Sequence, residues 1–224
     1  MDAGIHDLLL ICIKQEKSLA DISLDDMIAF SSIYHDDCLF LYKLLNMTDN
    51  EELEIQDDVH HISCFKENDS YIISFEERKL IFDALQLRKF MVILLDLFEI
   101  TLPLGSVVDL KKKYFKSAIK VDRVDRFRMV ITHRFLYSKG DSFFFPYGGI
   151  VYPIGTLFSQ NIVSFTPMLI ENVVHIGFSD EMEKEFVFAM KKELLGEYHM
   201  HSFGFAGQED VERYQEKLRK SVAK

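Results

Sequence analysis

The sequence contains no tryptophan and has only four prolines, ten glycines and three cysteines among 224 residues. So little glycine and proline excludes collagen-like and low-complexity chains, because both classes are rich in these residues. The cysteines, Cys12, Cys38 and Cys64, are odd in number and lie in apolar stretches. We therefore expect small buried side chains rather than the disulfide framework of a secreted domain.

Long apolar runs are also missing. The run at residues 8–13 has no basic segment before it and no small-residue cleavage site after it, so it does not resemble a secretory signal. The next longest, residues 90–95, is far shorter than the roughly 20 residues that span a bilayer. Apolar residues make up 48% and charged residues 28%, which is ordinary for a globular protein. The sequence predicts a soluble cytoplasmic protein without a membrane span.

Catalytic signatures are absent as well. The chain has no G-x-S-x-G, no P-loop, no H-E-x-x-H and no cysteine placed with a histidine in a recognised pattern. His60 with His61, and His199 with His201, are pairs that nothing nearby completes to the three or four ligands that zinc needs. We expect no catalytic residues, no metal and no cofactor, and keep a hydrolase or a nuclease as an alternative.

The balance of charged side chains and the glycine and proline content both change near Thr101. Residues 1–104 hold 8 basic and 21 acidic side chains, whereas residues 105–224 hold 18 basic and 15 acidic ones. All but one of the glycines and all but one of the prolines follow residue 104. The pattern predicts an α+β protein with three regions: a mainly helical acidic region at 1–100, a β-rich module with a closing helix at 101–198, and a link with a charged helix at 199–224.

Helical spacing dominates the front region. A first helix is marked by Ile5, Leu8 and Cys12, and further helix starts are predicted at Ser23 with Asp26 and at Asp36 or Asp37. Beyond an acidic loop, residues 59–65 and 70–75 flank a polar turn and predict one β-hairpin. Ser74 with Glu77 predicts the start of a buried helix over 76–98, and a strand at 90–95 is the alternative.

Alternation with period two dominates the back region. Phe127, Met129, Ile131, His133, Phe135 and Tyr137 are expected to share one face of a strand. Residues 143–145 and 173–178 predict further strands, so the module is expected to be compact and antiparallel. Asp180 with Glu183 predicts a helix whose stripe, including Met182 and Phe186, belongs to the core. The charged final helix has too narrow an apolar stripe to bury much, so it is either peripheral or dependent on a partner.

Two groups of residues are candidate binding sites. Basic side chains between residues 111 and 134 form a candidate basic patch, and the members we select are Lys111, Lys112, Lys113, Lys116, Arg126, Arg128 and Arg134. Such a patch suits an anionic protein surface or a solvated edge, and the acidic front region makes nucleic acid an unlikely main partner. The second group places aromatic rings beside bare backbone in what should be a loop or a strand end, and consists of Tyr147, Gly148, Gly149, Tyr152 and Pro153. Exposed aromatic rings there would bind a partner, and the alternative is a turn with packed tyrosines.

Three motifs resemble a known family. They are L-P-L-G-S-V-V at 102–108, Y-G-G-I-V-Y-P-I-G at 147–155 and V-V-H-I-G-F at 173–178. Together, over roughly residues 102–190, they resemble a family of small Firmicutes domains of unknown function that are encoded beside LXG toxins of the type VIIb secretion system. Pro146 stands where that family is expected to carry an acidic residue, and a long basic stretch separates the first two strands. Residues 1–100 resemble no family that we can name.

The resemblance implies a non-catalytic accessory chaperone or targeting factor that binds an LXG toxin before export. The alternative is an immunity protein that binds and neutralises the toxin domain, with its acidic half covering a basic cleft. Both interpretations require a protein partner, and the sequence does not separate them.

Overall fold

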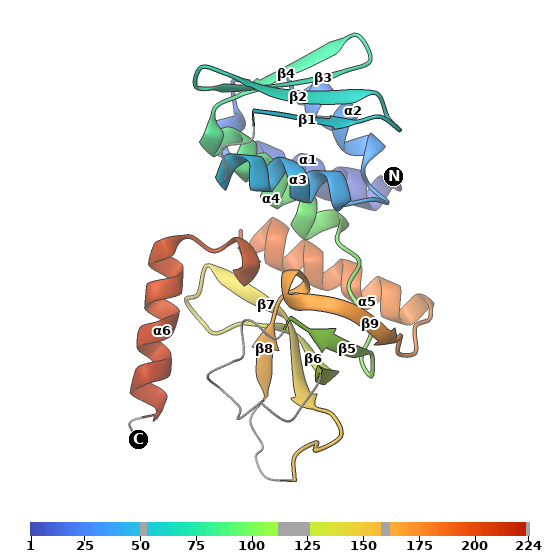
Figure 1. The fold of residues 1–224 in the computed structure, drawn as a ribbon, viewed down its shortest axis with the longest axis vertical. Coiled ribbons are helices and arrows are strands. Elements are labelled where there is room, and N and C mark those ends of the chain that lie inside the picture. Colours follow the sequence, from blue (N-terminus) through green and yellow to red (C-terminus); the bar gives the residue numbers. More distant parts are fainter. Residues whose placement is uncertain (50–52, 112–125, 158–161, 223–224) are drawn as a thin grey trace. The chain divides into compact units, whose positions relative to one another are not determined.

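The computed structural model of the protein describes residues 1–49, 53–111, 126–157 and 162–222 (Figure 1). The chain divides into two compact units. The first contains Met1–Ile100 with Leu195–His199, and the second contains Thr101–Leu194 with Met200–Lys224. Helices and strands occur in both units, so the predicted α+β class is confirmed. Of residues 199–224, which the sequence predicts as a region of their own, all but His199 belong to the second unit.

Four α-helices contribute to the described part of the first unit, and side-chain caps fix where they begin. They are α1 (Ala3–Gln15), α2 (Leu24–Ile33), α3 (Leu39–Asp49) and α4 (Ala84–Phe98). The Ser23 hydroxyl accepts a hydrogen bond from the backbone N–H of Asp26, as predicted. The Asp37 carboxylate likewise accepts from the N–H of Leu39 at the start of α3.

The strands of the first unit form an antiparallel meander in chain order. They are β1 (Glu54–Asp57), β2 (Ile62–Glu67), β3 (Ser70–Phe75) and β4 (Arg78–Phe82). The predicted single hairpin corresponds to β2 and β3 and is therefore incomplete. Ser74 lies within β3 and caps no helix, because the turn at Glu76, with φ of 50°, reverses the chain into β4.

Helix α4 starts only after this extra strand. The Asp83 carboxylate accepts from the N–H of Gln86, and the Gln86 side chain accepts from the N–H of Asp83, which completes a capping box. The predicted start at Ser74 with Glu77 is therefore wrong, and so is the alternative strand at 90–95. The prediction that this helix is buried is confirmed, since five of its apolar side chains have no exposed surface: Leu87, Phe90, Met91, Leu94 and Leu95.

The core of the first unit lies between its helices and one face of the meander (Figure 1). Cys64, Ile73 and Leu80 stand opposite one another on three adjacent strands, and all are buried. Burial raises the pKa of the Cys64 thiol to about 12, and burial together with Asp96 raises that of Cys12 to about 11. Both thiols stay protonated at neutral pH, so they serve as small apolar side chains, as predicted.

The second unit is organised around one curled sheet. Its strands are β5 (Val107–Leu110), β6 (Phe127–Leu136), β7 (Phe143–Val151), β8 (Val163–Phe165), β9 (Ile170–His175) and β10 (His201–Ser202). The order is β10-β7-β6-β5-β9, and β8 also pairs with β7. Every pairing is antiparallel except that of the short β10 with β7.

Two strands at opposite sides of this sheet, β8 and β9, follow each other in the chain, so the sheet must curl to bring them together. β8 pairs with β7 and β9 pairs with β5, yet only residues 166–169, which include the 3₁₀ turn Pro167–Leu169, separate them. The order β9-β5-β6-β7-β8, with this turn before the last strand, is the connectivity of an SH3-like barrel. Seven buried side chains fill the interior: Val108, Leu110, Phe127, Met129, Ile131, Tyr147 and Phe165.

A β-bulge interrupts the alternation predicted for β6. Phe127, Met129 and Ile131 face the interior, as expected. The pairing with β7 then shifts between Ile131 and His133, and the His133 side chain is exposed. The predicted shared face is therefore wrong from His133 onward, because the extra residue of a bulge reverses the facing of the later residues in the strand.

The opening segment 102–106 is held by hydrogen bonds from β6 and from the chain just after β9. Gly105, with φ of 80°, donates to the carbonyl of Ile131, and the N–H of Ile131 donates to the carbonyl of Ser106. The buried Ser106 hydroxyl accepts from the N–H of Gly177, which lies just after β9. A direct hydrogen bond thus joins Ser106 of the first motif to Gly177 of the third.

Two helices complete the described part of the second unit. α5 (Glu181–Lys191) begins at Asp180, whose carboxylate accepts from the N–H of Glu183, as predicted. α6 (Gln208–Val222) is the charged final helix. Its Tyr214 ring contacts Phe143 and other rings of this unit, and the Ser142 hydroxyl donates to Asp210. One aromatic side chain and polar contacts therefore hold α6, which agrees with the peripheral alternative.

Gly177→Ala should destabilise the second unit, because a Cβ at this position would lie 2.1 Å from the carbonyl oxygen of Leu104. We expect the free energy of unfolding to fall by about 2–3 kcal/mol. Urea unfolding followed by circular dichroism measures the change. Gly207→Ala is the control, since its new methyl group meets open space, and it should cost less than about 1 kcal/mol. Equal losses in the two variants would contradict the packing role of Gly177.

Candidate protein-docking surface

The fold buries some members of the predicted aromatic site and exposes others. Tyr147 lies on β7 and is only 1% exposed, and its hydroxyl accepts a hydrogen bond from the N–H of Leu102. Gly148 and Gly149 are buried on the same strand. The interpretation of these three residues as partner-binding is therefore wrong, because they lie within a central strand; the alternative of a packed tyrosine holds for Tyr147.

The two glycines permit close packing within the sheet. A Cβ on Gly149 would lie 2.5 Å from the carbonyl oxygen of Val130, and one on Gly148 would lie 2.8 Å from Ile162. The fold therefore requires their lack of a side chain. Tyr152 and Pro153, joined by a cis peptide bond, lie in the exposed turn after β7 and are the accessible members of the predicted site.

The predicted basic patch does not form one surface among the residues described. The Arg128 guanidinium donates two hydrogen bonds to Asp109, at 2.7 and 3.1 Å, and these hold the pKa of that buried carboxyl below its usual value. Lys111 donates to the carbonyl of Met168. Arg126 is exposed, 3.8 Å from Asp109. Lys112, Lys113 and Lys116 lie outside the described residues.

Arg134, the last member of the predicted patch, is a structural cation. Its side chain is 4% exposed and forms a bidentate ion pair with Glu183 on α5. The guanidinium also lies 5.6 Å from the centre of the Phe186 ring. The prediction of a surface cation is wrong here, because α5 covers this end of β6 and supplies the carboxylate.

An exposed apolar surface, which the sequence reasoning missed, follows β9 into α5. We call it the β9–α5 surface, and its large side chains are Leu104, Val173, Val174, Ile176, Phe178, Met182 and Phe186. Phe178 is 82% and Met182 is 75% exposed. The prediction that this stripe belongs to the core is wrong for Met182, whereas Phe186 is half-exposed and its ring still contacts Phe135. Large apolar side chains exposed this often within residues 173–186 indicate an interaction site.

The geometry of β9 explains this exposure. β9 is an edge strand, and no strand in the described part of the chain pairs with its outer edge. Val173 and Val174 are both exposed, and so are the other residues of β9 from Glu171 to His175, so little of this strand is covered. Helical periodicity marks an apolar stripe but does not reveal whether a sheet or solvent faces it.

The charged side chains around this surface are mainly acidic. Glu171 on β9 and Glu185 on α5 are exposed, as is Glu181, which pairs with Lys184 at 2.6 Å. Glu183 is already engaged by Arg134. The β9–α5 surface therefore combines an apolar centre with an acidic border, and it complements an apolar segment that carries basic residues.

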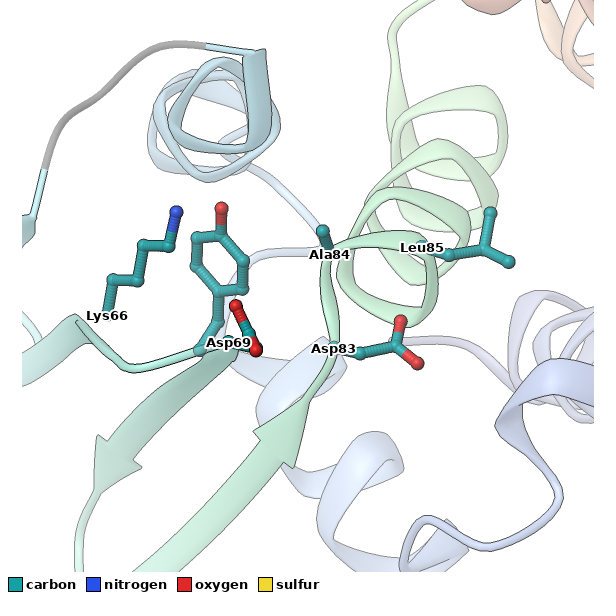
Figure 2. A pocket seen from close by; sticks show the side chains of 6 residues that line it. Lys66, Asp69, Asp83, Ala84 and Leu85 are labelled. Carbon is teal, nitrogen blue, oxygen red and sulfur yellow. The ribbon is translucent and has the colours of Figure 1, made fainter.

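The surface depressions of the first unit are shallow. One, of about 330 Å³, lies between the β2–β3 turn and the start of α4 (Figure 2). Lys66 and the Asp69 and Asp83 carboxylates give it mixed charge, and Asp83 already caps the N-terminus of α4. Another, of about 700 Å³ between α1 and α2, includes the ion pair of Asp26 with Arg78 at 2.9 Å. Both are open to solvent, and neither is as apolar as the β9–α5 surface.

A hydrogen-bonded group in the first unit has a structural role. The Tyr34 hydroxyl donates to Asp57, and the His60 ring nitrogen lies 2.7 Å from the same carboxylate oxygen. Burial alone would raise the pKa of Asp57, but these hydrogen bonds outweigh it and lower the pKa to about 2. The group ties the end of α2 to β1. Among the described residues, no three His, Cys, Asp or Glu side chains are grouped to hold a metal ion.

Comparison with known proteins addresses only the second unit. Residues 101–186 match a family described as Domain of unknown function (DUF4176). The predicted resemblance of this segment to a domain family of unknown function is confirmed. No curated protein and no solved structure matches the chain. In the part that the structure describes, no helix has the length and apolar character to cross a membrane.

Arg134→Met should destabilise the second unit, because it leaves the Glu183 carboxylate beside an apolar surface without its cation. We expect a loss of about 2–4 kcal/mol in the free energy of unfolding, measured by urea denaturation. Lys184→Met, which breaks an exposed ion pair on the same helix, should leave the urea midpoint unchanged. A similar shift in both variants would rule out a special role for the buried pair.

Asp57→Asn should make the stability of the first unit less sensitive to acid. The folded pKa of about 2 lies below the ordinary value of 3.8, so the carboxylate stabilises the fold above pH of about 4. That contribution, about 1 kcal/mol after allowance for solvent screening, is lost as the pH falls toward 2. Unfolding measured from pH 5 to 2 should give a shallower slope for the variant. The exposed Asp58→Asn should behave like the unmodified protein, and an unchanged slope in Asp57→Asn would refute the assignment.

Proposed function

We propose that the protein is a non-catalytic cytoplasmic binding protein that serves an LXG effector of the type VIIb secretion system as an accessory chaperone or targeting factor. The observation that carries the proposal is the β9–α5 surface, which exposes large apolar side chains on a well-packed module. A surface of this kind binds a polypeptide through buried apolar contacts. The motif resemblance over residues 102–190 supplies the effector class.

The motif residues support a binding role through what they do in the fold. Ser106 and Gly177 join the opening segment to the end of β9, and Tyr147 anchors Leu102 from the strand interior. Their side chains and backbone groups hold the segment that carries Leu104, Ile176 and Phe178 at the surface. The motifs thus position a docking surface rather than contribute reacting groups.

Co-purification tests this proposal. The full-length protein is co-expressed with the LXG region, and separately with the toxin domain, of the effector encoded nearest to it. Retention of the LXG region is the expected result. Retention and neutralisation of the toxin domain would instead establish the immunity alternative, in which the acidic residues of the first unit cover a basic cleft. Binding of neither region would contradict both, and the hydrolase or nuclease alternative would then be assayed directly.

Substitutions locate the interface. Phe178→Ser and Met182→Glu remove apolar contacts at exposed positions and should reduce the co-purified effector at least about tenfold without loss of folding. Val59→Ser changes an equally exposed residue of the first unit and should have no effect. Tyr152→Ser tests the exposed part of the predicted aromatic site. If only Tyr152→Ser abolishes retention, the turn after β7 is the interface and the β9–α5 surface is not.

A further inference from the structure

We infer that the β9–α5 surface accepts an amphipathic helix with basic flanks, and that it does not bind its partner by adding a strand to β9. This inference rests on the proposed function and names the form and chemistry of the bound segment. It depends on the pairing register of β9, on the exposed stripe of α5 and on the charges beside that stripe.

The register of β9 is unsuited to strand addition. Val107 pairs with His175 while Val108 pairs with Val173, so Val174 is an extra residue on β9. The same occurs between Asp109 and Leu110, whose partners are Asn172 and Ile170. Two bulges within six residues kink the strand and turn its backbone groups out of line. Bulged edges are a common protection against unwanted pairing, so an added strand would lack a continuous ladder.

Helix α5 presents a surface that suits another helix. Met182, Phe186 and Ala189 are exposed and follow the i, i+4, i+7 spacing of one helical face. The adjacent side of α5 is held to β6, because Arg134 pairs with Glu183 and the Phe186 ring, at the border of the exposed row, also contacts Phe135. The exposed row forms a ridge that can lie in the groove of a second helix, which is the usual packing of helix on helix.

The size and charge of the stripe describe the partner segment. From Met182 to Ala189 a helix rises about 10 Å, which corresponds to about two turns of a partner helix, and the exposed apolar residues before α5 extend the contact. Glu181 and Glu185 are exposed beside the stripe, and Glu171 is exposed on β9. Lys184 is paired with Glu181. A partner helix with Lys or Arg on both sides of an apolar stripe would complement this border.

Labelled synthetic peptides test the inference with the full-length protein in about 0.15 M salt. One 18-residue peptide places leucines at i, i+3, i+4 and i+7 with lysines on the flanks. A second has the same composition but alternates leucine and lysine, as in a strand. Fluorescence anisotropy should show at least tenfold tighter binding of the helical peptide. Tighter binding of the alternating peptide, equal binding of both, or binding of neither at 100 µM would overturn the inference.

Matched variants separate specific docking from general attraction to an acidic protein. Met182→Glu should weaken binding of the helical peptide at least tenfold. Glu185→Lys should weaken it about fivefold, whereas Glu209→Lys, the same charge change at an exposed position of α6, should alter it less than twofold. Equal losses in the two charge variants would show non-specific attraction and overturn the inference. Retention of the effector with failure of the helical peptide would remove the helix assignment alone and leave the proposed function standing.

Discussion

The close contact between Gly177 and the backbone of residues 104–106 is the constraint on which the second unit depends. Gly177 has no Cβ, so the chain after β9 can lie against the carbonyl oxygen of Leu104 and donate to the Ser106 hydroxyl. This contact sets where β9 ends and where the segment leading to α5 begins. Any larger residue would push this segment away, and the apolar side chains on either side would lose their common position.

A buried ion pair then sets the orientation of α5. Arg134 and Glu183 pair in a largely covered environment, where the geometry of a bidentate contact is more restrictive than that of apolar packing. With Glu183 turned toward β6, the helical period leaves Met182 on the accessible side and places Phe186 at its border, where the ring is half-exposed and also contacts Phe135. Exposed apolar side chains contribute little to the stability of an isolated unit, so their presence here is best explained by a partner that covers them.

Local signals predicted much of the framework. Ser23, Asp37 and Asp180 were identifiable as helix caps because capping is decided by residues three positions apart or fewer. The site was less predictable. Tyr147 and Arg134 are of residue types that are common at binding surfaces. Tyr147 nevertheless fills the sheet interior, and Arg134 neutralises Glu183. Met182 is of a residue type that is common in protein cores, yet it is exposed. Each of these outcomes depends on which distant strand or helix lies opposite.

By itself the sequence determined the boundary near Thr101, the α+β class, the burial of Cys12 and Cys64, and the helix starts that short-range hydrogen bonds define. Only the tertiary structure decided that the glycines at 148 and 149 serve close strand packing, that β9 is a bulged edge strand, and that an apolar face of α5 is left open. The physical reason is range. Capping and periodicity act within a few residues, whereas burial, pairing register and ion-pair formation depend on residues brought together from far along the chain.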